Sequence, residues 1–357
     1  MLGRYVRFAS AVIALLVFSA VGHAQEKTSS AVYRDVVAAY VKTGDPATAV
    51  KPLLGWDRKT LEAAVADTIA SSDATLLEAA AVLHLEIGVA IAGISTPSSH
   101  GYLELGERLV DALVPVNPEA RRNVNAQRAE EIARTGATYL AVAGSALLSV
   151  NVVFRARPFF AGALKITPKS PALLTLQGTA NEVDGAMLNP DDVESPLLKK
   201  RAAVDRTQFL LHAETLYRQA LEIDPDYALA QIRLGRVQFH LRKLKQAGEW
   251  LAKGNAAAKD PTHRYLAAMF TGALLQEQKD LAGARAAFEQ ALTLSPRSQS
   301  AIVALAYVEL ISGRPDRAQS LARGYVGTPN SDDGWWAYKN GTLDNAGLQW
   351  MRRRVRK

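Results

Sequence analysis

The sequence predicts an all-α protein built as a solenoid of antiparallel helix pairs. Alanine is abundant and runs of β-branched residues are few, which favours helix over strand. Apolar residues recur three and four positions apart, a spacing that places them on one face of a helix. Small residues recur at a spacing near 34, which is long enough for two helices and a turn. Together these patterns favour stacked helix pairs.

The first 24 residues have the pattern of a secretory signal peptide. Arg4 and Arg7 precede an apolar run, Phe8–Val21, and the small residues Gly22 and Ala24 stand where a signal peptidase cuts. The run has 14 residues, fewer than the roughly 20 that a membrane-spanning helix needs. We therefore expect cleavage after Ala24 and a periplasmic or secreted location in a bacterium. An uncleaved anchor is the alternative.

Charge and cysteine content exclude several classes of function. Two of the 42 bases lie in the first 24 residues and five lie in residues 352–357, which leaves the body of the chain with as many bases as its 35 acids. A neutral body argues against a nucleic-acid-binding face. The chain has no cysteine, which excludes disulfides, thiolate catalysis and Cys-ligated zinc.

Two ladders of small residues define the repeat. Counting between rungs gives a unit of 34 residues, with one insertion of 23 residues and one of three. A large apolar residue follows the first four rungs of the second ladder by four positions and weakens to Ala322 after the fifth, and proline or a nearby proline ends most units. The first ladder is Gly144, Gly178, Gly235, Gly272 and Ala306; the second is Ala156, Ala213, Ala247, Ala284 and Ala318; the large residues are Phe160, Tyr217, Leu251 and Phe288.

This pattern resembles the tetratricopeptide repeat (TPR) over about Ala137 to Asp332, and Gly283–Pro296 is the cleanest copy. The resemblance implies a right-handed superhelix of helix pairs whose first helices line a concave groove. It also implies a scaffold that binds other proteins. Small residues where two helices cross allow close approach, and the large apolar residue fills the space beside them. Asp224-Pro225-Asp226 is then the hinge between two units.

The predicted organisation has four parts. Residues 1–24 are the signal peptide, 25–136 an N-terminal helical region, 137–332 an array of about five units, and 333–357 a cap. Within the N-terminal region we expect a divergent unit over Ser30–Ala63, broken at Gly44-Asp45-Pro46 and carrying Ala49, Leu53 and Trp56 on its second helix. Two amphipathic helices, Thr75–Gly93 and Tyr102–Val114, should follow.

The 23-residue insertion falls near residues 179–212. Leu188–Pro196 is a loop by composition, and Leu197–Ile223 then runs 27 residues without glycine or proline. This run forms the second helix of the unit that contains the insertion, and we expect that helix to be about four turns longer than the second helices of neighbouring units. A harmless extension and a docking arm are both open interpretations.

The C-terminal segment is aromatic and basic. Thr342 is a candidate N-cap for a final helix, and Trp335, Trp336 and Trp350 are candidates to cover the last repeat. The alternative is peripheral contact between residues 342–357 and an anionic membrane. A solvated end is the simplest interpretation.

Catalytic and metal-binding patterns are absent from the sequence, so we expect no enzyme, no cofactor and no metal site. There is no phosphate-binding glycine loop, His-Glu-x-x-His or Gly-x-Ser-x-Gly motif. The five histidines beyond the signal have no metal-ligand spacing, and we expect them on surfaces or partly buried. An enzyme site within Gln25–Asn117 is the less favoured alternative.

The surface therefore carries the functional hypothesis: an exported scaffold of the cell envelope that binds an extended or helical segment of a protein partner. The predicted groove is mostly apolar, and its charge is limited to Glu182 and Arg236. It does not match the basic clamp by which some TPR proteins hold a C-terminal carboxylate, and filling of the groove by the chain itself is an open alternative. The predicted groove residues are Leu148, Thr175, Glu182, Leu229, Ile232, Arg236, Phe239, Met269, Gln276, Val303, Tyr307 and Leu310.

Overall fold

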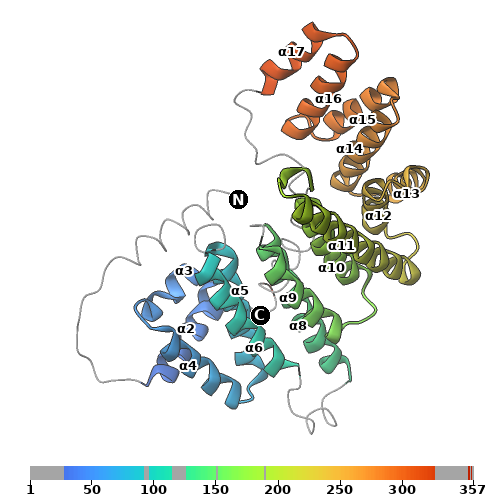
Figure 1. The fold of residues 1–357 in the computed structure, drawn as a ribbon. Helices are drawn as coiled ribbons and strands as arrows, with labels where there is room; N and C mark the ends of the chain where they lie inside the picture. Colours follow the sequence, from blue (N-terminus) through green and yellow to red (C-terminus); the bar gives the residue numbers. More distant parts are fainter. Residues whose placement is uncertain are drawn as a thin grey trace. The chain divides into compact units, whose positions relative to one another are not determined.

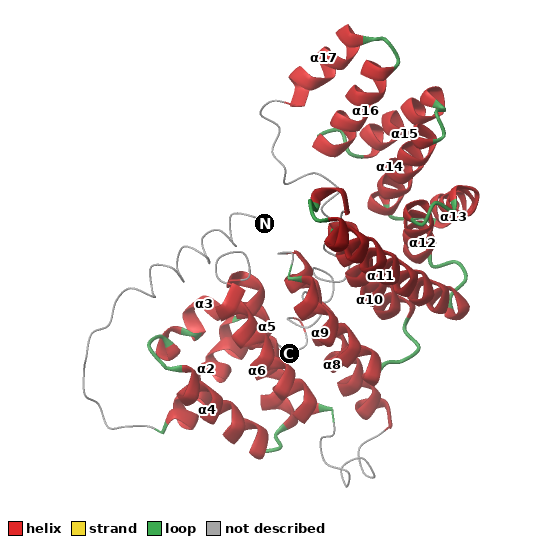
Figure 2. Cartoon of the chain, viewed as in Figure 1, coloured by secondary structure: helices red, strands yellow, loops and turns green. Residues whose placement is uncertain are grey.

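The computed structural model describes residues 28–91, 96–114, 126–149, 152–188 and 190–325, together with Arg353 and Val355. Regular structure in these residues is helical and includes no strand (Figure 2), so the predicted all-α fold is confirmed. None of the helices described there combines the length and the hydropathy that a membrane crossing requires. The predicted signal peptide and the three tryptophans of the predicted cap lie outside the described residues.

Described residues up to Pro168, together with Arg353 and Val355, belong to one compact unit, and residues from Lys169 to Tyr325 belong to a second. This division does not test the predicted four-part organisation, which stays a prediction. The first unit contains α2 (Ser29–Thr43), α3 (Pro46–Ala49), the 3-10 turn η1 (Lys51–Leu53), α4 (Arg58–Ala70), α5 (Ala74–Ile91), α6 (Thr96–Leu113), α8 (Ala126–Ser149) and α9 (Val153–Ile166) (Figure 1). The second contains α10 (Pro171–Met187), η2 (Pro190–Asp192), α11 (Pro196–Ile223), α12 (Ala228–His240), α13 (Leu244–Ala257), α14 (Pro261–Glu277), α15 (Leu281–Leu294), α16 (Gln299–Ile311) and α17 (Pro315–Tyr325).

The predicted break after the first helix is confirmed. Gly44 ends α2 with a left-handed φ of 62° and donates its N–H to the carbonyl of Tyr40, and Asp45 caps α3. The prediction of one second helix in this divergent unit is wrong, because the chain is interrupted there. Pro52 lacks an N–H, and Gly55 has a φ of 93°, so the chain forms a short 3-10 turn and α4 begins only at Arg58.

The next two predicted helices exist, with one shifted boundary. The predicted Thr75–Gly93 corresponds to α5, which packs against α6. The predicted Tyr102–Val114 begins six residues earlier, at Thr96. Pro97 tolerates the first turn of a helix because the N–H it lacks has no partner there, so the composition that suggested a turn also suits a helix start.

The glycines of the first predicted ladder pack against the large apolar residues as the repeat requires. In four helix pairs the glycine lies directly against the large apolar residue of the partner helix, so that there is no room for a Cβ. A methyl group added to the glycine would lie 2.5–2.8 Å from that residue in every pair named here. The pairs are Gly144 with Phe160, Gly178 with Tyr217, Gly235 with Leu251, and Gly272 with Phe288.

Three helix pairs of the second unit share one turn. The second residue after the first helix adopts a left-handed backbone, with φ of 62° at Arg242, 66° at Lys279 and 74° at Gly313. The next N–H then reaches back to a carbonyl of the helix, as from Lys243 to Gln238 at 2.9 Å. These tight turns make neighbouring helices antiparallel.

The inserted segment lengthens α11. This helix has 28 residues, whereas α13 and α15 have 14 each, which confirms the predicted four additional turns. At the other end, α11 stops at Ile223 and α12 starts at Ala228, so Asp224-Pro225-Asp226 is a hinge between helices as predicted. The carbonyl of Pro225 accepts a hydrogen bond of 2.6 Å from Gln231.

Candidate partner-binding groove

The predicted groove residues lie on the first helices of the pairs. Leu148 belongs to the first unit, and the rest belong to the second. The second-unit members are Thr175 and Glu182 on α10; Leu229, Ile232, Arg236 and Phe239 on α12; Met269 and Gln276 on α14; and Val303, Tyr307 and Leu310 on α16.

Half of the predicted set is buried within the protein. Ile232, for example, is fully enclosed and lies against Gly254 of α13, where an added methyl group would be 2.5 Å from its Cγ1. A side chain in this position holds two helices together and offers no surface to a partner. The partner-binding role of the whole set stays a prediction, and the buried members are Leu148, Thr175, Glu182, Leu229, Ile232 and Met269.

Glu182 is one of two charges predicted in the groove, and it points into the interior. Its carboxylate accepts a hydrogen bond of 2.6 Å from the hydroxyl of Tyr217 and lies 3.5 Å from Nη1 of Arg233. Both members of this ion pair are fully buried. A buried pair leaves a costly unpaired charge when either partner is removed, so Glu182 is a packing residue of α10–α12.

Arg236, the second predicted charge, remains partly exposed. Its guanidinium lies over the Phe239 ring at 5.4 Å and over the buried Phe270 ring of α14 at 5.0 Å. Beside it, Nη2 of Arg206 donates to Nδ1 of His240 at 3.3 Å. The pKa of His240 falls to about 3 because of burial first, then the charges of Arg236 and Arg206.

The outer face of α16 is open. Val303, Tyr307 and Leu310 are 54%, 51% and 55% exposed. They follow one another at four and three positions, so that they form a single apolar stripe along the helix. These three residues are the part of the predicted groove that presents most apolar surface.

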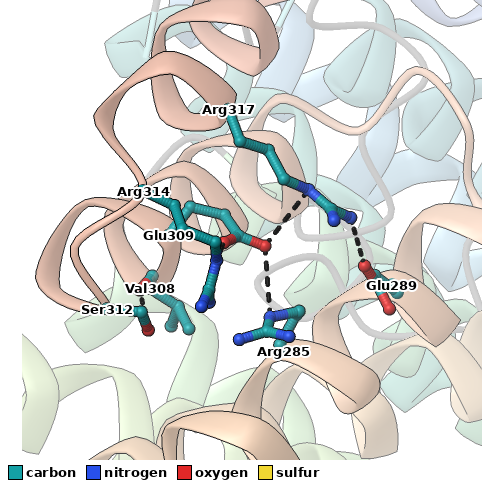
Figure 3. A network of polar contacts seen from close by, with 7 residues as sticks. All are labelled: Arg285, Glu289, Val308, Glu309, Ser312, Arg314 and Arg317. Atoms are coloured by element: carbon teal, nitrogen blue, oxygen red, sulfur yellow. Dashed lines mark hydrogen bonds and ion pairs between the residues drawn. The ribbon is translucent and has the colours of Figure 1, made fainter.

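The inner side of α16 carries a buried carboxylate. Glu309 is fully enclosed and is bonded by Arg314, while Nε of Arg285 and Nε of Arg317 lie 3.2 Å from its Oε1 (Figure 3). Arg317 also reaches Glu289 of α15 at 2.6 Å. These ion pairs attach α17 to α15 and α16, where the apolar ladder weakens to alanine.

The first unit holds two polar contacts that the sequence analysis missed. His84 is buried, although we expected the histidines on surfaces or partly buried. Its Nε2 lies 2.8 Å from the Tyr33 hydroxyl, and burial lowers its pKa to about 4. The hydroxyl of Tyr40 donates to Glu86 at 2.9 Å. The available signal was the spacing of Tyr33 and Tyr40, which are seven residues apart and so lie on one helix face. When that face is buried, each hydroxyl needs a hydrogen-bond partner.

The described residues contain no group of three or more His, Asp or Glu side chains placed to hold a metal ion. The acidic loop near η2 is solvated: Asp191 is 79% exposed and pairs with Lys199 at 2.7 Å. The predicted membrane contact of residues 342–357 falls almost wholly outside the described residues.

One segment of the second unit matches a known family. Residues 212–269, which span the end of α11 to the middle of α14, match the family model described as tetratricopeptide repeat. This part of the chain is a tetratricopeptide repeat. The TPR match covers the Gly235–Leu251 contact, and the same pairing of a rung glycine with a large residue recurs outside the matched segment.

Solved structures similar to this chain include other helical-repeat proteins. PilF of Pseudomonas aeruginosa is 15% identical, with 63% of this chain and 93% of that chain covered and a TM-score of 0.42. MamA of Desulfovibrio magneticus RS-1 is 18% identical over 55% and 97% of the two chains, with a TM-score of 0.38. YrrB, described as a TPR protein with an unusual peptide-binding site, is 16% identical over 57% and 92%, with a TM-score of 0.35. No curated protein sequence matches the chain. Similarity at this level transfers no ligand to this chain.

Proposed function

We propose that this protein is an exported scaffold that binds a protein partner on the first helices of its second unit. Tetratricopeptide repeats are generally non-catalytic scaffolds for protein interaction, and residues 212–269 match that family. The signal-like start of the chain supports export into a bacterial cell envelope.

The observation that carries the proposal is the open stripe of α16. Val303, Tyr307 and Leu310 expose half or more of their side chains on one helix face. Such a stripe is complementary to the apolar face of a docked helix or to alternate side chains of an extended segment. Mutual burial of apolar surface would supply most of the binding free energy.

Site-specific photo-crosslinking tests this surface. A benzophenone side chain introduced in place of Tyr307 should crosslink a specific partner in envelope extracts, and the same group at Ala286, an exposed position on α15, should not. Leu310→Glu, added to the first variant, should abolish the crosslink because it places a charge in the apolar stripe. Equal crosslinking from both positions would contradict the proposal.

Export is tested separately. Sequencing of the mature protein from fractionated bacteria should find Gln25 at the N-terminus, and deletion of residues 2–24 should leave the protein in the cytoplasm. A full-length chain recovered from the cytoplasm would contradict this part of the proposal.

A further inference from the structure

A cationic cluster lies where α11, α12 and α14 meet within the second unit. Arg206 comes from α11, Arg236 and His240 from α12, and Phe270 from α14. The Arg206–His240 bond of 3.3 Å and the Arg236–Phe270 contact of 5.0 Å tie the three helices together. Arg206, Arg236, Phe239 and His240 are partly exposed, so that the cluster borders solvent.

The cluster offers donors without acceptors. Because the guanidinium of Arg206 can only donate, Nδ1 of His240 accepts, and the proton of the neutral imidazole lies on Nε2. This Nε2 and Nε of Arg236 are buried atoms with no hydrogen-bond partner among the described residues. Orphaned buried donors are uncommon in native proteins and call for an explanation.

The cluster also lacks a counter-charge. Within the described residues, neither Arg206 nor Arg236 has a carboxylate oxygen within 4 Å. The charge of Arg206 acts on the carboxyl group of Asp191, but only weakly. The pKa of Asp191 is lowered first by its hydrogen bond to Lys199 and least by Arg206. Both arginines depress the pKa of the same imidazole, which shows that their positive charges act at one place.

The extra turns of α11 build this cluster. A second helix of 14 residues, the length of α13 and α15, would begin near Leu210 and would not include Arg206. The insertion therefore does more than lengthen α11: it places a second guanidinium group, that of Arg206, beside the end of α12.

We propose that Arg206, Arg236 and His240 form a binding site for the carboxylate of an acidic side chain in the partner segment. The inference rests on the proposed function and names the chemistry of the partner: an aspartate or glutamate flanked by apolar residues. The guanidinium carbon of Arg236 lies 5.4 Å from the Phe239 ring centroid and 5.0 Å from the Phe270 ring centroid, so that the two rings help to fix its position. A planar fork of donors binds two carboxylate oxygens better than a point charge does.

Two capped peptides test the site on the full-length protein. Acetyl-Ser-Leu-Glu-Leu-Ser-amide and its glutamine counterpart differ by one charged group. Isothermal titration should give binding about tenfold tighter for the glutamate peptide, as expected for a charge-assisted hydrogen bond. NMR titration of His240 should show that this peptide raises the imidazole pKa, because a nearby anion favours the charged form.

Matched variants separate the site from general charge. Arg206→Gln and Arg236→Gln should each remove most of the glutamate preference. Arg236→Lys, which keeps the charge without the planar fork, should retain part of it. Arg201→Gln is the control, because it removes the same charge from the same helix at a position 79% exposed, and it should leave the preference intact.

Three results would overturn the assignment. They are equal affinity of the two peptides for the unaltered protein, an Arg201→Gln effect as large as that of Arg236→Gln, and inorganic phosphate alone binding as tightly as the glutamate peptide. The proposed function can be refuted independently of this site, because its test measures crosslinking from position 307 on α16. A partner captured there without any glutamate preference would leave the scaffold standing and remove the carboxylate site.

Discussion

Helices α12 and α16 occupy the same place in the repeat, yet one face is closed and the other is open. Ile232 and Val303 are equivalent positions, and their exposed fractions are 0% and 54%. Arg236 lies against Phe270 of the following first helix, whereas the equivalent Tyr307 is 51% exposed. Both side chains at the first position are β-branched and apolar. Residue type therefore does not set the burial of this position; the neighbouring residues do.

The inner sides of these helices differ as well. Where α16 has Glu309 among three arginines, α12 has the neutral Gln238, which donates to Glu214 at 3.2 Å. The apolar ladder supports the α12–α13 pair through Leu251, but its last rung at Ala322 is small. Ion pairs therefore supplement the apolar contacts of α17, such as those of Leu321.

Truncation of the two equivalent side chains should give the largest contrast. Ile232→Ala should lower the free energy of unfolding by about 2–5 kcal/mol, since it leaves a cavity in the core. Val303→Ala should cost less than about 0.5 kcal/mol, because the side chain is half in water. Urea denaturation followed by circular dichroism, with hydrogen exchange of α12 and α16, measures both. Equal losses would show that the two faces are not different in burial.

Removal of the buried charge on α16 should come next. Glu309→Gln should cost about 2 kcal/mol and should loosen α17, because three arginines lose their common partner. Glu289→Gln is the control: its carboxylate is 44% exposed and, among the residues that the structure describes, pairs with Arg317 alone, so we expect a loss below about 1 kcal/mol. Hydrogen exchange of α17 reports both changes. An identical loss from the two variants would contradict a special role for Glu309.

Acid should weaken α12 through His240, while α16 has Ile311 at the equivalent position. The folded pKa of about 3 lies below the unfolded value near 6.5, so the stabilisation is complete above pH 6.5 and is lost as pH falls toward 3. Since His240 is partly exposed, we expect a loss of about 2 kcal/mol. His240→Asn keeps an acceptor for Arg206 and should flatten this part of the pH profile. If the His240→Asn variant had the same pH dependence of stability as the unaltered protein, His240 would be excluded as its cause. The buried His84 and the partly buried His263 would then account for the whole acid-induced loss.

The turns should give the smallest effect. Lys279 adopts a left-handed backbone where the α16–α17 turn has Gly313. Lys279→Gly should stabilise the protein by about 0.5 kcal/mol, and Gly313→Lys should destabilise it by about 1 kcal/mol. Thermal unfolding under one buffer condition compares them. A loss of stability in Lys279→Gly would show that side-chain contacts at Lys279 outweigh the backbone strain.

The fold could be predicted from the sequence because its determinants are local and periodic. Gly272 and Phe288 are 16 residues apart. Because Phe288 leaves no room for a larger side chain at position 272, a glycine recurs there in the repeat and can be recognised in the sequence. The long α11 followed from 27 residues without a helix breaker. The break inside the divergent first unit was only partly foreseen, because Pro52 and Gly55 act through backbone geometry that apolar spacing does not encode.

The candidate site was harder to predict for a physical reason. Position in the repeat tells which way a side chain leaves its helix but not what lies across from it. Glu182 has a groove position and is nevertheless buried, since Tyr217 and Arg233 supply its partners. Arg206 was missed because it comes from the insertion, where no repeat position applies.

The strongest packing in each unit joins helices that follow one another in the chain, such as α10 with α11 and α14 with α15. Contacts of such short sequence separation need little loop closure, so that folding should be fast. The α14–α15 pair can form once the roughly 34 residues from Pro261 to Leu294 are available, whereas the α10–α11 pair needs the roughly 53 residues from Pro171 to Ile223. The chain is therefore suited to acquire its structure stepwise, from the first pair to the last, as it emerges from a ribosome or a narrow pore.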